Sequence, residues 1–219
     1  MIDELNECAV RHFPGALGAG SADGWFYAIM NDVHWVKPAM PRKTAWLTAN
    51  GCQCYYGYSG HQIESAPFPI WMPALMKEVM EKCDVDSKDW PNSCNLNLYE
   101  DENNSVGWHA DNEELFQGTK EHTRIISLSL GAPRTFGVKG NKHYRGPVSL
   151  MQVVLFNGDL LIMDGMAQKH LVHSVLKEDA RTWPHKGQGP RINLTWRWTK
   201  KHRCDLRREN PAPLAQPSP

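Results

Sequence analysis

Two histidines and an aspartate are the residues best suited to hold a metal ion. In His109-Ala-Asp111 an imidazole and a carboxylate stand two positions apart, so on a β-strand both side chains would point the same way. A third ligand must come from elsewhere in the chain, and the candidates are His170 and His173. Two imidazoles and one carboxylate leave positions open on an octahedral ion, which is the ligand set of non-haem Fe(II) oxygenases.

A polar strand face near the C-terminus could hold a ligand that fills those open coordination positions. Alternate residues of the stretch 191–197 are polar, namely Arg191, Asn193, Thr195 and Arg197. The interleaved residues are Ile192, Leu194 and Trp196, so one face of the strand can pack while the other presents two guanidiniums. Guanidiniums bind carboxylates bidentately, which favours a 2-oxo acid held beside the metal. The alternative is that this face simply meets water, as one face of many antiparallel sheets does.

The elements that must position these residues are mostly short strands. The periodicity predicts helices over 21–30 and 73–82. It also predicts strands over 44–46 and 54–58 around an Asn50-Gly51 turn, and then over 95–99, 106–111, 124–130, 134–138, 151–156, 159–163, 171–176 and 191–198. Many short strands without intervening helices indicate a sandwich or barrel, and so a mainly β fold with flanking helices.

Composition favours a globular, intracellular protein. The 219 residues suffice for one generous domain, and no stretch approaches the ~20 apolar residues of a membrane span. The first residues lack the pattern of a secretory signal. The six cysteines include no C-x-x-C pair, so we expect free thiols in a reducing compartment. Cys52-x-Cys54 resembles half of a zinc site, but no second pair with ligand spacing is evident.

Charge is balanced overall and uneven along the chain. The formal net charge is zero, so bulk charge does not indicate a nucleic-acid partner. Between residues 122 and 158 there is no acid, and Asp205 is the only acid between 181 and 208. This asymmetry is compatible with a basic surface for phosphates, and equally with ordinary solvated faces.

Taken as a set, the motifs resemble those of the AlkB family of Fe(II)- and 2-oxoglutarate-dependent nucleic-acid dioxygenases, and most closely its nuclear alkylated-base repair members. The matching segments are Pro41-Arg-Lys-Thr-Ala-Trp46, Tyr56-Gly-Tyr-Ser-Gly60, Asn97-Leu-Tyr99, His109-Ala-Asp111, His173-Ser174 and Arg191 to Arg197. The resemblance implies a double-stranded β-helix (jelly-roll) core with an N-terminal substrate-binding extension. The expected divisions are 1–93 for the extension and recognition elements, 94–200 for the core and 201–219 for a disordered tail.

The resemblance also implies a role for each matching residue. It assigns iron to His109, Asp111 and His173. It assigns 2-oxoglutarate to Asn97, Tyr99, Arg191, Asn193, Thr195 and Arg197, with Arg191 on the distal carboxylate. Tyr58 would stack on an extruded base, Trp46 and Tyr56 would line the same pocket, and Asn112 and Glu113 would read the base edge. For the three aromatics the alternative is ordinary core packing.

The function implied by this resemblance is oxidative demethylation of N-alkylated bases such as 1-methyladenine and 3-methylcytosine, in DNA and also in RNA. The expected cofactors are Fe(II) and 2-oxoglutarate, with O2 as co-substrate, and the expected partner is nucleic acid carrying an alkylated base. We expect a monomer that lies in the nucleus or cytoplasm and does not associate with membranes. The alternatives are an RNA demethylase with a regulatory role, a dioxygenase of protein side chains, and a non-catalytic nucleic-acid binder on the same fold.

Overall fold

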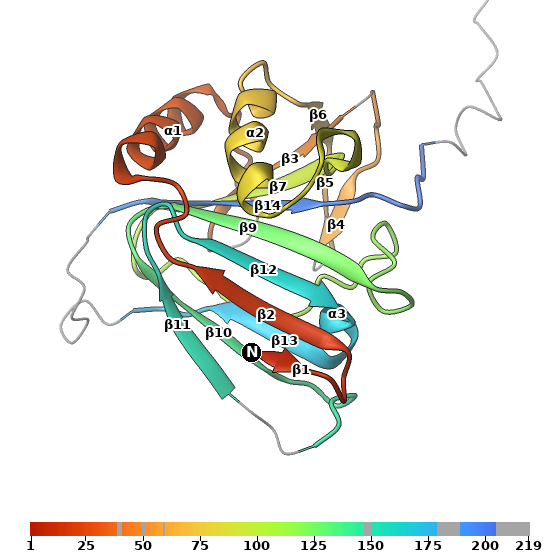
Figure 1. Ribbon diagram of the computed structural model, residues 1–219. Coiled ribbons are helices and arrows are strands. Elements are labelled where there is room, and N and C mark those ends of the chain that lie inside the picture. Colours follow the sequence, from red (N-terminus) through yellow and green to blue (C-terminus); the bar gives the residue numbers. More distant parts are fainter. Residues whose placement is uncertain (39–40, 50, 59, 147–149, 179–188, 205–219) are drawn as a thin grey trace, which may run out of the picture.

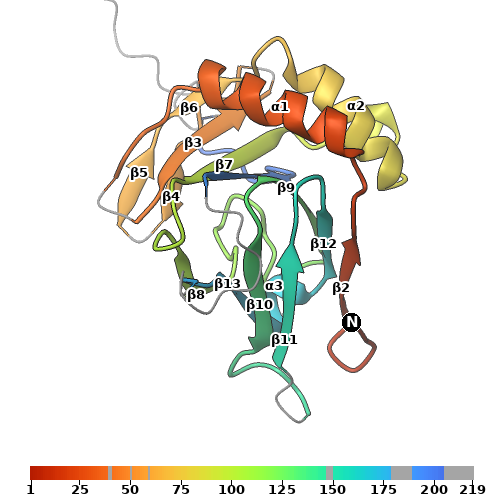
Figure 2. The ribbon, with the colours of Figure 1, turned by 90° about the vertical axis from the view of Figure 1, so that its left-hand side faces the viewer.

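The fold is known from a computed structural model, which describes residues 1–38, 41–49, 51–58, 60–146, 150–178 and 189–204. Two sheets face one another and two helices cover the outer side of the larger one (Figure 2). This arrangement confirms the predicted mainly β fold with flanking helices. Among the described residues no helix is long and apolar enough to cross a membrane.

The larger sheet has eight strands. In spatial order they are β1 (Ile2–Asp3), β2 (Cys8–Phe13), β12 (Leu160–Gly165), β9 (Thr123–Gly131), β14 (Arg191–Arg197), β7 (Ser93–Tyr99), β3 (Lys43–Thr48) and β6 (Ser65–Pro67). Every neighbouring pair is antiparallel except β3 and β6, which run parallel. The central position of β14 places its alternating residues in the middle of the molecule.

The smaller sheet has four strands, in the order β11 (Leu150–Leu155), β10 (Arg134–Gly140), β13 (Leu171–Val175) and β8 (Val106–His109). A separate hairpin of β4 (Tyr56–Tyr58) and β5 (His61–Ile63) stands beside the strands β3 and β7 (Figures 1 and 2). Tyr56, the first residue of β4, lines a cavity that also includes residues of both sheets.

Helices α1 (Ala19–Asp32) and α2 (Met72–Lys82) pack on the outer face of the larger sheet (Figure 1). Pro73 stands in the first turn of α2, where its missing N–H costs nothing. The apolar stripe of α2 is Met72, Leu75, Met76, Val79 and Met80, all buried. Two short helical turns complete the fold, η1 (Ser87–Asp89) and α3 (Ala167–His170).

Strand β14 shows how the alternating pattern is used. Ile192, Leu194 and Trp196 are fully buried in the cluster that includes α1 and α2. Complete burial of such side chains stabilises a fold by about 1.5–3 kcal/mol each. The alternate polar residues therefore face the smaller sheet, and none of them is exposed to bulk water. The prediction of one packing face is confirmed, and the alternative of a solvated polar face is wrong.

Several predicted details differ from the structure. The strand expected over 106–111 ends at His109, so Asp111 is not a strand residue. The strands on either side of Gly51 do not pair, because β3 lies between β7 and β6 while β4 pairs with β5. Strands β1, β2, β5 and β6 and the turn α3 were not expected, since each is short or only weakly alternating. The proposed boundary at residues 93 and 94 remains a prediction, as does the disordered tail, most of which lies outside the described residues.

Candidate metal centre and co-substrate cavity

The three predicted metal ligands converge on one point between the sheets. His109 is the last residue of β8, His173 is the middle residue of β13, and the two are direct cross-strand partners. One ligand atom from each of His109, Asp111 and His173 lies within 4.8 Å of the others. The Asp111 Oδ1 atom is 3.7 Å from His109 Nε2 and 3.9 Å from His173 Nε2. If each atom lay ~2.1 Å from a six-coordinate ion, neighbours would be about 3 Å apart, so a small inward movement suffices.

Protonation at the centre suits metal binding. Burial, reinforced by the charge of His109, lowers the pKa of His173 to about 3, and burial also lowers the pKa of His109. Both imidazoles are therefore neutral at physiological pH, with lone pairs available. Nδ1 of His109 donates to the backbone carbonyl of Gly107 at 2.8 Å, which leaves Nε2 as the ligand atom.

The carboxylate of Asp111 is held in place from behind. Arg197 donates from Nε, at 3.0 Å, and from Nη2 to Oδ2 of Asp111, which leaves Oδ1 facing the histidines. Burial alone would raise the pKa of Asp111, but the Arg197 guanidinium and the two imidazoles together hold it well below its usual range. The backbone N–H of Asp111 donates to the Gln168 side chain at 2.8 Å, so the ligand is fixed although it lies beyond the strand.

His170 is excluded as the third ligand. Its Nδ1 lies 2.7 Å from the backbone carbonyl of His143, and it belongs to no metal-binding group among the described residues. The ring of His173 instead stacks on Phe136 at 5.5 Å and meets the ring of His109 at 4.3 Å. Ligand spacing alone left the choice between these two histidines open and the family resemblance implied His173, which the register of β13 and β8 places opposite His109.

A polar cavity adjoins the triad. Its walls include the triad itself and the predicted co-substrate residues Asn97, Tyr99, Asn193, Thr195 and Arg197, together with Tyr56. Many of these polar groups bind one another. Nδ2 of Asn193 donates to Ser127 at 2.8 Å and its Oδ1 accepts from Thr195 at 2.9 Å. Such a connected network fixes the rotamers around the space that a ligand would fill.

Arg191 carries the strongest indication of a missing anion. Its side chain is 1% exposed, and Nη2 donates to Ser129 at 2.9 Å. Nε and Nη1 have no hydrogen-bond partner among the described residues. Burial lowers the pKa of Arg191 to about 10, yet at neutral pH the group remains charged. A buried cation with two unused donors is costly unless a ligand carboxylate completes it.

The predicted base-recognition residues lie at the β4 side of the cavity. Trp46 and Tyr56 stack at 5.2 Å and are 1% and 4% exposed. Nε1 of Trp46 donates to the Cys54 carbonyl at 2.8 Å, so Trp46 forms the wall behind Tyr56 and does not itself line the cavity. The side chain of Tyr58 lies outside the described residues. Asn112 is exposed and Glu113 half-buried, with both following the metal ligand Asp111.

Several residues of the site were not singled out from the sequence. Arg42 is buried and its Nε donates to Asn97 at 2.8 Å. Gln168 fixes Asp111, and Phe116 packs against both Trp46 and Tyr56. Arg42 stands inside a matching motif, so its charge next to that strand was an available signal. The positions of Gln168 and Phe116 depend on chain folding that no local pattern reveals.

The sequence is similar to that of known proteins. Residues 9–197 match the family model described as the 2OG-Fe(II) oxygenase superfamily. The chain is 32% identical over 202 residues to the mouse protein named alpha-ketoglutarate-dependent dioxygenase alkB homolog 3, covering 84% of this chain and 64% of that protein. It is 30% identical to the Arabidopsis thaliana protein named DNA oxidative demethylase ALKBH2, covering 79% of this chain and 61% of that one.

A solved structure shows the same fold. The structure of OsALKBH1 superposes with a TM-score of 0.59 at 19% identity, covering 86% of this chain and 97% of that one. The likeness confirms the jelly-roll core that the motifs implied. The chain spans 64% and 61% of the length of the mouse and Arabidopsis relatives, so their longer sequences contain segments without a counterpart here.

Proposed function

We propose that this chain, which belongs to the 2OG-Fe(II) oxygenase superfamily and within it to the AlkB family, removes alkyl groups oxidatively from damaged bases in DNA. The proposal includes RNA as a second substrate. Iron would be held by His109, Asp111 and His173. The observation that carries the proposal is the buried Arg191, whose Nε and Nη1 have no hydrogen-bond partner among the described residues and which lies opposite the cavity-lining Tyr99.

The donor sets fit both groups that the family uses. Two neutral imidazoles and one carboxylate suit Fe(II) and leave three positions open. Arg191 lies on the same strand face as Asn193 and directly opposite Tyr99 in the register of β7 and β14, and both of those residues line the cavity. A 2-oxoglutarate molecule would place one carboxylate at Arg191 and the 2-oxo acid end toward the metal, with Asn97, Asn193 and Thr195 along its length.

Iron held by His109, Asp111 and His173 would supply, with 2-oxoglutarate and O2, hydroxylation of the N-alkyl carbon, with formation of succinate and CO2. A hydroxymethyl group on a base nitrogen then leaves as formaldehyde and restores the base. The protein residues supply placement, because the base must leave the stack before its methyl group can reach the metal. The β4–β5 hairpin and Tyr56 stand where such a base would enter.

Glu113 is suited to recognise the base edge. Its Oε2 atom is buried and has no hydrogen-bond partner among the described residues, so it can accept an N–H from the substrate. Adenine and cytosine both carry an exocyclic amino group beside the ring nitrogen that is alkylated in 1-methyladenine and 3-methylcytosine. These alkylated bases are also cationic. Burial raises the pKa of Glu113 to about 7, so a cationic base next to Glu113 would favour its ionised form.

Basic side chains offer sites for the phosphate backbone. Lys142 and Arg145 are exposed in the loop after β10. Lys200 and Lys201 are exposed in the segment after β14, where they form surface ion pairs with Glu121 and Glu114. Arg134, by contrast, is 2% exposed and donates to the backbone carbonyl of Pro133, so it cannot contribute to a phosphate-binding surface. Phosphate contacts position a nucleic acid without selecting its sequence, which suits repair of scattered lesions. We propose a monomer acting in the nucleus or cytoplasm.

The deciding experiment is formaldehyde release from oligonucleotides that carry 1-methyladenine or 3-methylcytosine, as single-stranded DNA, duplex DNA and RNA in parallel. Asp111→Ala and His173→Ala are expected to abolish release, while His170→Gln serves as the matched histidine control and retains it. Turnover that survives Asp111→Ala would contradict the assignment of the metal centre. Binding of nucleic acid without succinate formation would favour the non-catalytic alternative, and release from RNA alone would replace DNA as the substrate.

A further inference from the structure

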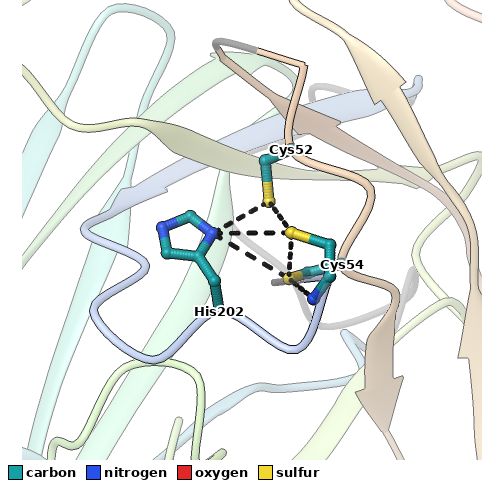
Figure 3. Close-up of side chains that lie close together, drawn as sticks. Cys52, Cys54 and His202 are labelled. Carbon is teal, nitrogen blue, oxygen red and sulfur yellow. Dashed lines mark hydrogen bonds between the residues drawn. The ribbon is translucent and has the colours of Figure 1, made fainter. Parts of the chain in front are cut away.

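Three cysteines and a histidine gather at a place that the iron chemistry does not use. Cys52 and Cys54 lie in the loop between β3 and β4, while His202 and Cys204 lie in the segment that follows β14 (Figure 3). All six cysteines of the chain are free. Cys52-x-Cys54 has no second cysteine pair with ligand spacing in the sequence. The second pair is His202-x-Cys204, about 150 residues away.

The distances within this cluster match a tetrahedral zinc site. The Sγ atom of Cys204 lies 3.3 Å from that of Cys54 and 3.8 Å from that of Cys52. Nδ1 of His202 lies 3.3–4.0 Å from the three sulfurs. With Zn–S of about 2.3 Å and Zn–N of about 2.0 Å, tetrahedral geometry separates two sulfurs by about 3.8 Å and a sulfur from a nitrogen by about 3.5 Å.

The same distances do not fit a disulfide. An S–S bond is about 2.05 Å long, and the nearest described pair, Cys54 and Cys204, is 3.3 Å apart. A disulfide would also use two sulfurs and leave the third thiol and the imidazole without a purpose. Four ligand atoms converging from two distant segments are better explained by an ion that all of them share.

Backbone amides provide a second, independent indication. The backbone N–H groups of Arg203 and Cys204 point at the sulfur of Cys54, at 3.0 and 3.4 Å. Amides that donate to sulfur stabilise a metal-bound thiolate and orient it, as outer partners do at metal sites generally. Three thiolates with one Zn²⁺ carry a net charge of −1, and Arg203, whose backbone N–H donates to the Cys54 sulfur, can balance it.

We propose that Cys52, Cys54, His202 and Cys204 bind one structural zinc ion. Zinc accepts the Cys3His ligand set in closed tetrahedral sites, and binding displaces one proton from each of the three thiols. No position remains open for substrate, so the ion acts as a cross-link. It joins the loop that leads into β4 to the segment that leaves β14, and both of these strands contribute to the cavity.

The cross-link bears directly on the base-recognition side of the cavity. Cys54 belongs to the same buried cluster as Trp46, Tyr56 and Phe116, against which Cys52 and Cys204 pack. The loop is also held by bonds from Thr48 to the Cys52 carbonyl at 2.7 Å and from Arg203 to the Tyr55 hydroxyl at 2.8 Å. Zinc would therefore fix Tyr56, two residues beyond Cys54, without contacting the iron centre.

The first test counts zinc directly. The triad can also accept zinc because imidazole and carboxylate both bind it, so the count is made in an Asp111→Ala background. We expect about one zinc per chain there, retained after dialysis, and close to none when Cys204→Ser or Cys52→Ser is added. The matched control is Cys83→Ser, a buried cysteine outside the cluster, which is expected to keep the full zinc content.

Cobalt substitution gives a second readout on the folded Asp111→Ala chain. Co²⁺ bound by three thiolates produces intense thiolate-to-metal absorption and visible bands of tetrahedral type, and these are expected to vanish with Cys204→Ser. If the cysteine variants do not fold, the zinc content and the cobalt spectrum of the Asp111→Ala chain alone still test whether the site binds metal. Absence of zinc and of these bands from the parent would overturn the proposal, as would a Cys54–Cys204 disulfide found by mass spectrometry.

The role assigned to the ion has its own test, which rests on the proposed function. In the otherwise natural chain, Cys204→Ser is expected to lower Tm by roughly 5 °C or more. It is also expected to raise KM for a methylated oligonucleotide at least about tenfold while KM for 2-oxoglutarate stays within about twofold. Equal changes in both KM values would refute the local role of the zinc. If the natural chain itself showed no turnover, the proposed activity would be refuted and not the zinc site.

Discussion

Replacement of Arg191 by methionine tests the co-substrate assignment most sharply. The guanidinium is 1% exposed, with two donor atoms that have no partner among the described residues. A hydrogen bond to a charged group contributes about 1.5–3 kcal/mol, and burial leaves little solvent to screen it. Two such bonds to a carboxylate amount to ~3–6 kcal/mol. At about 1.4 kcal/mol for each tenfold change, Arg191→Met should weaken 2-oxoglutarate binding at least about 100-fold.

The same substitution should leave the ligand-free protein as stable as before. Burial lowers the pKa of Arg191 to about 10, which means that the folded chain holds this charge at a cost when no anion is present. Replacement of an imperfectly paired buried charge by an apolar side chain of similar volume is often neutral or stabilising. We therefore expect an unchanged or higher Tm for Arg191→Met without ligand, and a smaller rise in Tm on addition of 2-oxoglutarate.

Calorimetric titration of the Mn²⁺-loaded protein measures this affinity without turnover. A comparison with 2-oxobutanoate, which lacks the distal carboxylate, isolates the contact in question. The natural chain should prefer 2-oxoglutarate strongly, and the variant should bind the two acids about equally. Arg124→Met, which removes a guanidinium paired with Asp164, is the control. An affinity within about threefold of the natural chain, or an undiminished preference for the dicarboxylic acid, would refute the role of Arg191.

Two further predictions concern the surroundings of the site. Gln168→Ala removes the acceptor that holds the Asp111 backbone at 2.8 Å, and should weaken Mn²⁺ binding about 10–100-fold. The exposed Gln152→Ala should not change it, and equal affinities in both variants would contradict the role of Gln168. Burial raises the pKa of Cys83 to about 11, so its thiolate fraction at pH 8 is about 10⁻³. Alkylation of Cys83 in the folded chain, followed by mass spectrometry, should accelerate about tenfold per pH unit up to about pH 11, and a rate that is flat with pH would contradict this.

The parts of the fold that sequence predicts best are those with a clear period. Strand β14 alternates polar and apolar residues without exception, and α2 carries an unbroken apolar stripe with a proline in its first turn, so both were located to within a residue or two. Strands β5 and β6 have three residues each, too few to show a period. Their existence depends on pairing with β4 and β3, which is a tertiary property.

The same distinction, between local patterns and tertiary pairing, applies to the candidate site. The choice of His173 over His170 follows from the register between β13 and β8, which places His173 opposite His109. The unused donors of Arg191 and the burial of Arg42 appear only once the second sheet is in place. The Cys3His cluster was missed because its two halves are far apart in the chain. Spacing rules identify each half as a ligand pair, but only the three-dimensional fold shows that the halves meet.

Strand β14 joins the two ligands of the active site in a single rigid element. Arg197 at one end of the strand donates to Asp111, and Arg191 at the other end would bind the distal carboxylate of the proposed co-substrate. If bound metal fixes the position of Arg197 and, through it, strand β14, metal binding strengthens co-substrate binding. By thermodynamic linkage, the co-substrate then strengthens metal binding by the same factor. Scarcity of either one would then lower the occupancy of both, so under the proposed function the chain would respond to the supply of iron and of the 2-oxo acid through one strand.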